Sequence, residues 1–180
     1  MSNSETLRDI DLGAYVRDVP DFPKPGILFK DITPLLRAPE ALDAALERMV
    51  RPFRDAGITQ VAAIESRGFI FGGAIAARLG CGFVPIRKPS KLPWTTYRHE
   101  YQLEYGSDAL EIHDDALAPS DRVLLVDDVL ATGGTAAAAR SLIALFGAHL
   151  AAISVVIELE FLTGRMRLDG VPVHSLIRYA

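Results

Sequence analysis

The chain has 180 residues, a length that fits one domain with a full hydrophobic core. Apolar residues make up 49% of it and charged residues 23%, as in ordinary globular proteins. A net charge of −4 argues against a nucleic-acid-binding protein, because such a protein would carry a basic face.

The single cysteine, Cys81, excludes an internal disulfide, fits a reducing compartment and is expected to lie in the core. Residues 2–9 are polar and acidic, unlike a secretory signal. The longest apolar stretch, residues 142–157, is too short to span a bilayer. We therefore expect a soluble, cytoplasmic protein with neither a membrane nor a nucleic-acid partner.

The predicted elements before residue 60 are a helix over residues 5–19, a stiff helix-free stretch over 20–26, a short apolar segment over 27–29 and a helix over 39–56. Three prolines in the helix-free stretch fix φ and remove backbone donors. Pro39 suits the first turn of the last helix, Pro52 predicts a kink in it, and Gly57 is its expected stop.

Alternating apolar strands and helices follow. Strands are predicted over residues 61–64 and 83–87 with a helix around 70–79 between them, and the turn over 65–68 joins strand to helix. Residues 123–157 form a second strand–helix–strand unit. Such units imply a parallel sheet covered by helices on both faces.

Residues 88–115 interrupt this pattern. The segment starts polar and proline-rich, and residues 101–105 and 109–113 then alternate apolar and polar side chains. With Gly106-Ser107-Asp108 between them, they predict an antiparallel hairpin. A long excursion from a rigid sheet is a candidate lid.

The segment from Arg122 to Thr135, RVLLVDDVLATGGT, is the most informative part of the chain. A buried strand over 123–126 is followed by two acids, a loop of small residues over 131–135, and a helix over 136–146. Backbone N–H groups and the positive helix end attract an anion, and the glycines let it approach closely.

This loop lacks the lysine of a Walker A motif and the spacing of a dinucleotide fingerprint. It therefore suits one terminal phosphate, while the adjacent acids suit sugar hydroxyls or a hydrated Mg²⁺. Together they predict a ribose 5-phosphate site. A plain strand–helix turn with a capping Asp explains neither the paired acids nor the threonines that flank two glycines.

Five basic residues fall at two strand ends and in the excursion: Arg67, Arg87, Lys88, Lys91 and Arg98. Because parallel strands end along one edge of a sheet, Arg67, Arg87 and Lys88 are expected to converge near the loop. Such cations suit a diphosphate group. Arg98 fits ordinary surface charge equally well. The four histidines show no metal-ligand spacing and are interpreted as structural.

The segment over 126–135 resembles the phosphoribosyl diphosphate (PRPP) motif of type I phosphoribosyltransferases. Residues 65–69, ESRGF, are similar to the family's diphosphate-binding loop, residues 86–93 to its basic segment, and 103–106 to its flexible catalytic loop. Residues 21–34 resemble the segment that marks members using adenine rather than orotate or hypoxanthine. The resemblance runs from about residue 20 to residue 165, and Met166 stands where the family often has Glu.

The resemblance implies an α/β fold with a central, mainly parallel sheet flanked by helices, a β-hairpin lid and a small amino-terminal base-binding hood. Residues 1–180 would form a single phosphoribosyltransferase domain, with the hood over 1–35 and the flexible catalytic loop or hairpin over 88–115. It also implies a homodimer.

The implied reaction transfers the 5-phosphoribosyl group of PRPP to N9 of adenine, giving AMP and diphosphate in purine salvage. Mg²⁺ would be held by PRPP and water, with no direct protein ligand. The implied catalytic residues are Glu104, Arg67, Asp127 and Asp128. Those for the 5-phosphate and ribose are Asp127, Asp128, Ala131, Thr132, Gly133, Gly134 and Thr135. Those for diphosphate are Ser66, Arg67, Arg87, Lys88, Lys91 and Tyr105. Those for adenine are Leu28, Phe29 and Lys30, with Phe29 stacking on the purine and backbone groups of its neighbours reading the base edge.

Two alternatives stay open at this point. One is a hypoxanthine, guanine or xanthine phosphoribosyltransferase, which differs only in the base that it accepts. The other is a non-catalytic regulator that keeps the fold and senses PRPP. A regulator would need an added DNA- or RNA-binding element, and the sequence shows none.

Overall fold

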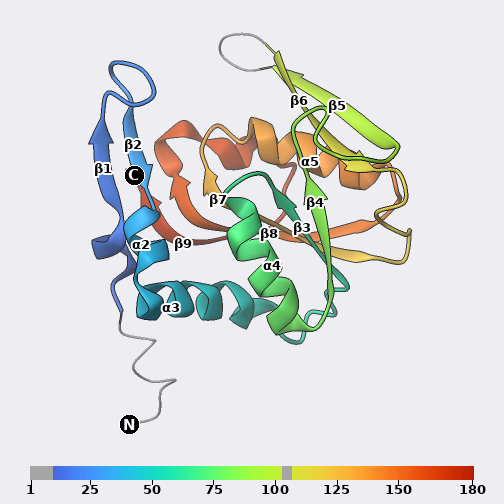
Figure 1. Cartoon of the computed structure of the whole chain (residues 1–180), viewed down its shortest axis with the longest axis horizontal. Coiled ribbons are helices and arrows are strands. Elements are labelled where there is room, and N and C mark those ends of the chain that lie inside the picture. Colours follow the sequence, from blue (N-terminus) through green and yellow to red (C-terminus); the bar gives the residue numbers. More distant parts are fainter. Residues whose placement is uncertain (1–9, 103–106) are drawn as a thin grey trace. The chain divides into compact units, whose positions relative to one another are not determined.

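The structure is a computed structural model of the chain, and it describes residues 10–102 and 107–180. The chain forms two compact units, Met1–Arg48 and Met49–Ala180. Figure 1 shows the elements of both units, coloured from blue to red along the sequence. Among the described residues, no helix combines the length and the apolar character that a membrane span requires.

The amino-terminal unit is built around a two-stranded antiparallel sheet. Its described elements are η1 (Leu12–Tyr15), β1 (Arg17–Pro20), β2 (Leu28–Asp31), α2 (Thr33–Arg37) and the first part of α3 (Pro39–Val50). Strand pairing places Arg17 opposite Asp31. The Arg17 guanidinium also donates to the Asp31 carboxylate at 2.6 Å, and this hydrogen bond is the main reason that the pKa of Asp31 falls to about 2.

The helix predicted over residues 5–19 is wrong within the part of that range that the structure describes. Residues 12–15 form only a 3-10 turn, which Asp11 caps by accepting from the Gly13 N–H at 2.9 Å, and Arg17–Pro20 is a strand. Pairing with β2 satisfies the backbone groups of this segment. A tertiary contact thus overrides a weak local helix preference that Gly13 lowers further.

The helix predicted over residues 39–56 is shorter than expected. Helix α3 ends at Val50 and a 3-10 turn, η2 (Arg51–Phe53), follows it. Pro52 has no backbone N–H for the next α-helical hydrogen bond, so the α-helix ends just before Pro52 and does not continue through a kink. Gly57 has φ 66, as a stop residue should.

The larger unit contains a parallel sheet of five strands in the order β4-β3-β7-β8-β9. These strands are β3 (Gln60–Ile64), β4 (Gly82–Ile86), β7 (Arg122–Leu130), β8 (His149–Leu159) and β9 (Val173–Tyr179). Helix α4 (Gly68–Leu79) packs closely on β3, since a Cβ on Gly72 would lie 2.5 Å from the Ala63 Cβ. Helix α5 (Gly134–Ala144) covers the other face of the sheet. The predicted fold class, a parallel sheet flanked by helices, is confirmed.

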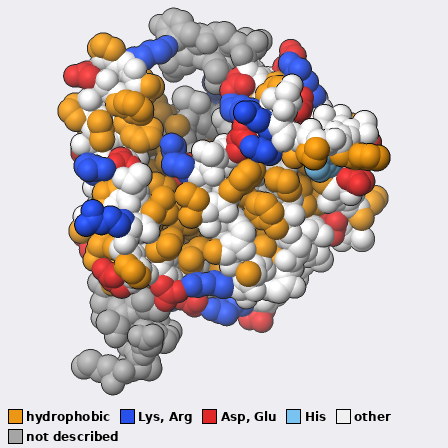
Figure 2. Space-filling view, viewed as in Figure 1, with side chains coloured by type: hydrophobic (Ala, Val, Ile, Leu, Met, Phe, Trp, Pro, Cys, Tyr) orange, Lys and Arg blue, Asp and Glu red, His pale blue; other side chains and the backbone are white. Residues whose placement is uncertain are grey.

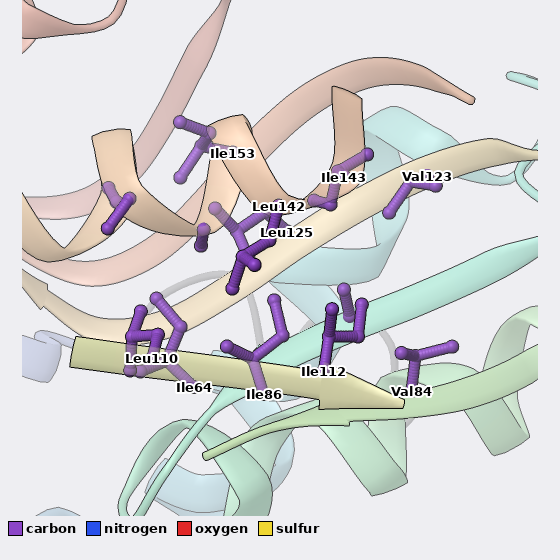
Figure 3. Close-up of a cluster of buried hydrophobic side chains, with 14 of the residues drawn as sticks. Ile64, Val84, Ile86, Leu110, Ile112, Val123, Leu125, Leu142, Ile143 and Ile153 are labelled. Atoms are coloured by element: carbon purple, nitrogen blue, oxygen red, sulfur yellow. The ribbon is translucent and has the colours of Figure 1, made fainter. Parts of the chain in front are cut away.

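One hydrophobic core cluster lies between the sheet, helix α5 and a hairpin. Figure 3 shows Leu142 of α5 close to Leu125 of the sheet and Ile143 toward Val123 of the same strand, with Leu110 and Ile112 of the hairpin beside the strands. Burial of these aliphatic side chains anchors the hairpin to the sheet, so the base of the candidate lid belongs to the core.

The hairpin consists of β5 (Thr96–Gln102) and β6 (Ser107–His113), paired from Thr96↔His113 to Gln102↔Ser107. The predicted hairpin is confirmed, but its strands start earlier than expected: β5 begins before residue 101, and Ser107 and Asp108 belong to β6 rather than to the turn. Residues 103–106 lie outside the described part. Backbone hydrogen bonds between Arg87 and Glu111 join the hairpin to the end of β4.

Strand β7 is longer than predicted and contains both acids. Its pairing with β3 ends at Ala63↔Val126, whereas its pairing with β8 continues to Leu130↔Glu158. The acids therefore lie on a strand end that is paired on one side only. Helix α5 starts at Gly134, two residues before the predicted start, so the small-residue loop is shorter and tighter than the sequence suggested.

Candidate active site

The loop after β7 encloses a hollow of about 80 Å³. Its lining includes Asp127 and every residue from Leu130 to Ala136, so all five residues predicted to hold the phosphate are brought together there. Gly133 has φ 79, a conformation that side chains other than glycine rarely adopt. The start of α5 follows directly, with its unpaired N–H groups and positive dipole end at the hollow.

A second segment, at Gly164, packs against this loop through close backbone contacts. A Cβ on Gly133 would lie 2.3 Å from the Gly164 carbonyl oxygen, and a Cβ on Gly164 would lie 2.2 Å from the Ala131 carbonyl oxygen. Neither position has room for a side chain. The backbone of the loop is therefore held rigidly before any ligand arrives.

The two adjacent acids have different surroundings. Asp128 is buried and forms an ion pair with Arg67. Asp127 is half-buried, lines the hollow, and accepts from the Asp128 N–H at 2.9 Å. Burial, and then the negative charge of Asp128, raise the pKa of Asp127 well above its usual range. Asp128 thus positions an arginine, while Asp127 faces the hollow.

The turn over residues 65–68 is packed onto the end of β7. A Cβ on Gly68 would lie 3.0 Å from both the Asp127 Oδ1 and the Val126 carbonyl oxygen. The peptide bond between Glu65 and Ser66 is cis, and Ser66 is exposed. This close approach brings Arg67 beside the acids, as the sequence predicted.

Glu65 holds the end of β4 against this turn. Its carboxylate accepts from Arg87 Nε at 2.7 Å and from the Lys88 backbone N–H at 3.1 Å. Arg87 also donates to the Lys91 carbonyl oxygen at 3.0 Å. Lys91 is exposed, and among the described residues its contact with the site is through its backbone carbonyl oxygen.

Lys88 connects the hairpin with the phosphate loop. Its ammonium forms an ion pair with Asp108 and donates to the Tyr101 hydroxyl at 3.2 Å. Thr135 of the loop donates to the same hydroxyl at 3.5 Å. Burial by itself would lower the pKa of Lys88, but the hydrogen bonds to Asp108 and Tyr101 outweigh it and raise that pKa.

The three cations predicted to converge do so, and each contacts a carboxylate: Arg67 with Asp128, Arg87 with Glu65, and Lys88 with Asp108. On the face seen in Figure 2, Lys and Arg side chains likewise stand beside Asp and Glu side chains rather than forming one basic field. Arg98 forms an exposed ion pair with Glu100 at 3.0 Å, which favours the surface-charge interpretation.

The residues predicted to contact a base lie on β2 of the amino-terminal unit. Leu28 is 50% exposed, and Phe29 packs edge-on against Phe22 with ring centroids 5.1 Å apart. Lys30 forms an ion pair with Asp18 at 2.6 Å. An aromatic ring beside an exposed apolar residue is a suitable surface for a planar base.

Four of the sequence predictions need separate comment. Glu104 and Tyr105 fall outside the described residues. Cys81 is half-buried rather than a core residue, because it follows the left-handed Gly80 at the end of α4. Burial raises the pKa of its thiol, and a raised pKa disfavours a nucleophilic thiolate. In the described ranges, no group of three His, Cys, Asp or Glu side chains is arranged to hold a metal.

Sequence reasoning missed Tyr101, Asp108 and Gly164 as parts of the site. No local motif marks them. Tyr101 and Asp108 reach Lys88 only because the hairpin folds back onto the sheet. Gly164 contacts the loop only because the chain after β8 returns to the end of β7. The family resemblance around Met166 was the one available signal for Gly164.

A model of the phosphoribosyl transferase domain family matches residues 33–169, which include strands β3, β4, β7 and β8 of the sheet and the candidate site of the larger unit. The match spans more than half of the chain, and the fold agrees with it. The chain is a phosphoribosyltransferase by family.

Close relatives narrow this class. The adenine phosphoribosyltransferase of Methylococcus capsulatus is 58% identical over 93% of this chain and 98% of its own length. The crystal structure of adenine phosphoribosyltransferase from Thermoanaerobacter pseudethanolicus has a TM-score of 0.91 and 46% identity, and covers 99% of this chain and 100% of its own. That of the Saccharomyces cerevisiae enzyme, complexed with an imino-altritol bisphosphate and adenine, has a TM-score of 0.88 and 38% identity over 96% and 99%. The chain belongs to the adenine phosphoribosyltransferase family.

Proposed function

We propose that the protein transfers the 5-phosphoribosyl group of PRPP to N9 of adenine and releases AMP and diphosphate. The observation that carries this proposal is the convergence, at one edge of the sheet, of a glycine-walled phosphate hollow, Asp127 and three cations. The yeast relative is seen with adenine in its structure. Purine salvage by phosphoribosyl transfer to adenine accounts for the phosphate hollow, Asp127 and the three cations together.

In this proposal the 5-phosphate lies in the hollow, where it accepts from backbone N–H groups at the start of α5 and from the hydroxyls of Thr132 and Thr135. Asp127 would accept from the ribose hydroxyls. Because burial and Asp128 raise the pKa of Asp127, a nearby cation would stabilise its ionised form. A hydrated Mg²⁺ carried by PRPP fits that position and would neutralise charge on the diphosphate.

The ribose C1–oxygen bond to diphosphate would lengthen first, its electron pair leaving with diphosphate, and N9 of adenine would then attack the cation-like carbon with inversion. Arg67, Arg87 and Lys88 would stabilise the leaving group, with Ser66, Lys91 and Tyr105 as further contacts. Such catalysis needs positioning and electrostatics rather than a covalent nucleophile. We assign Glu104 to proton transfer at adenine.

For the base, we propose that Phe29 stacks on the purine and that backbone groups of Leu28 and Lys30 read its edge. Strand β2 pairs with β1 alone in its sheet, so alternate backbone groups of β2 point away from β1. A backbone donor and acceptor distinguish a 6-amino from a 6-oxo purine, because the wrong base leaves buried polar groups unpaired.

On the family resemblance we also propose that the protein is a cytoplasmic homodimer. The same resemblance supports a single catalytic domain over residues 1–180, in which residues 1–35 act as the base-binding hood and residues 88–115 as the moving segment over the substrates.

The test is turnover with Mg²⁺, PRPP and a panel of adenine, hypoxanthine, guanine and xanthine at equal concentration. AMP should form from adenine far faster than any other nucleotide forms, by about 10⁴-fold if backbone hydrogen bonds read the base. Comparable turnover of a 6-oxo purine would contradict the specificity. Binding of PRPP without turnover of any base would instead favour the regulator.

A further inference from the structure

The turn η4 (Gly164–Arg167) lies directly against the phosphate loop. The backbone contacts of Gly164 with Ala131 and Gly133, already described, leave no space between the two segments. The residues that follow Gly164 are therefore placed relative to the loop by backbone packing and not by a flexible side chain.

Arg165 fixes this turn from its other side. Its guanidinium donates to both oxygens of the buried Glu158 carboxylate, with Nη2 at 2.6 Å from Oε2. Ser175 donates to the same carboxylate at 2.6 Å. The charge of Arg165 is thus balanced within the protein, and its role is to hold η4.

Arg167 is directed at the phosphate loop instead. Its Nη1 lies 3.6 Å from the point where a Cβ on Gly134 would stand, and the Thr132 hydroxyl oxygen lies 3.9 Å from the same point. Gly134 is the first residue of α5, where the helix presents N–H groups to the hollow. The guanidinium is therefore within reach of a group that these N–H groups and Thr132 would bind.

Within the described residues, no carboxylate neutralises Arg167. The acid nearest to it in sequence, Asp169, pairs with Arg140 at 2.6 Å. This contrasts with Arg67, Arg87 and Lys88, each of which holds an acid. A guanidinium that adjoins an anion-binding loop and has no acid partner suits an anionic ligand.

We propose that Arg167 binds the 5-phosphate of PRPP and AMP and supplies the positive charge that the loop itself lacks. The loop offers backbone and hydroxyl donors but contains no lysine or arginine between Asp128 and Ala139. A guanidinium from η4 completes the set with charge-assisted hydrogen bonds. This assignment rests on the proposed function, since it takes a 5-phosphorylated ribose as the ligand.

The test compares calorimetric binding of AMP and adenosine to the wild type, Arg167→Lys and Arg167→Gln. Losing a charge-assisted hydrogen bond should weaken AMP about ten- to a hundredfold in Arg167→Gln, with a smaller loss in Arg167→Lys. Adenosine, which has no phosphate, should bind all three equally. In steady-state kinetics the KM for PRPP should rise more than kcat falls.

Two control variants separate this role from others. Arg51→Gln removes the same charge at an exposed position of η2, and Met166→Gln alters the neighbouring, 83% exposed residue of η4. Both should bind AMP like the wild type. Unchanged AMP affinity in Arg167→Gln, or an equal loss for AMP and adenosine, would overturn the assignment.

Titration with inorganic phosphate keeps this test independent of the base. If the wild type fails to use adenine, the proposed function fails, yet inorganic phosphate still reports on Arg167. Weaker phosphate binding in Arg167→Gln than in Arg51→Gln supports the assignment, and equal binding by these two variants overturns it.

Discussion

The phosphate loop and the cations beside it are built in opposite ways. The loop, residues 131–135, is continuous in sequence and is held by backbone contacts with Gly164 that allow no adjustment. The cations Arg67, Arg87 and Lys88 come from separate segments, and side-chain carboxylates hold them. The loop is a fixed cradle, whereas ion pairs place the cations near it, and in the proposed function a diphosphate would replace these acid partners. Variants in the two regions should therefore fail in different ways.

The largest effect is expected for Gly133→Ala. Its Cβ would lie 2.3 Å from the Gly164 carbonyl oxygen, in a residue with φ 79, so the loop must shift and the hollow must change shape. We expect AMP binding and turnover to be lost and the melting temperature to fall. The control is Gly73→Ala in α4, where a Cβ meets no heavy atom within 4 Å and where alanine favours the helix by roughly 0.5–1 kcal/mol. Normal AMP affinity in Gly133→Ala would show that the cradle is not fixed.

Next in size is Asp127→Asn, which should lower kcat/KM about 10²- to 10³-fold, since it removes a charge aimed at the reacting sugar. The pKa of Asp127 is raised, so its ionised form is lost at a higher pH than for an ordinary aspartate as the pH falls. We expect an acid limb in the wild-type profile of kcat/KM against pH, and its absence in the variant. Identical profiles would remove Asp127 from the proposed mechanism.

A smaller effect of opposite sign is expected for Asp108→Asn. Without its acid, Lys88 is available to diphosphate, so diphosphate should bind several-fold more tightly, as measured by calorimetry. Asp115→Asn, which removes an exposed acid just after the hairpin, is the matched control. Weaker diphosphate binding in Asp108→Asn would show that this acid supports the site instead of competing for Lys88.

The Asp108 variant should also unfold more easily, but only within a pH window. Burial opposes the shift, yet hydrogen bonds from Lys88 and the Ala109 N–H lower the pKa of Asp108, while the pKa of Lys88 is raised. The pair therefore stabilises the fold above the ordinary pKa of aspartate, and this contribution is lost as the pH falls through the lowered pKa. At the alkaline end it is lost as the pH rises through the raised pKa of Lys88. Since both side chains are more than a quarter exposed, the contribution should be about 1 kcal/mol or less, measured by denaturant unfolding.

The smallest effect is expected for Arg98→Gln. Its ion pair with Glu100 joins two side chains that are each more than half exposed. Such pairs contribute about 0–1 kcal/mol, so turnover and unfolding free energy should match the wild type within error. A clear loss of PRPP affinity would assign Arg98 to the diphosphate site after all.

The sequence predicted most reliably where one short segment contains everything that its structure needs. The loop is such a case, since strand, acids, glycines and helix follow one another within residues 122–146. The strands predicted at residues 61–64 and 83–87 also have short apolar patterns, and both were confirmed within a residue. The helix predicted over residues 5–19 was wrong within the described part because pairing with β2, whose residues lie 8 to 14 positions later in the sequence, decided that segment.

By itself, then, the sequence determined the fold class, the phosphate cradle and the set of basic residues, because apolar periodicity and glycine chemistry act over a few neighbouring residues. Only the tertiary structure decided how far β7 extends past its acids, which carboxylate each cation holds, and that Gly164 and Arg167 adjoin the loop. These depend on contacts between segments that are distant in sequence. Such contacts form only when the sheet, the hairpin and the turn after β8 pack together.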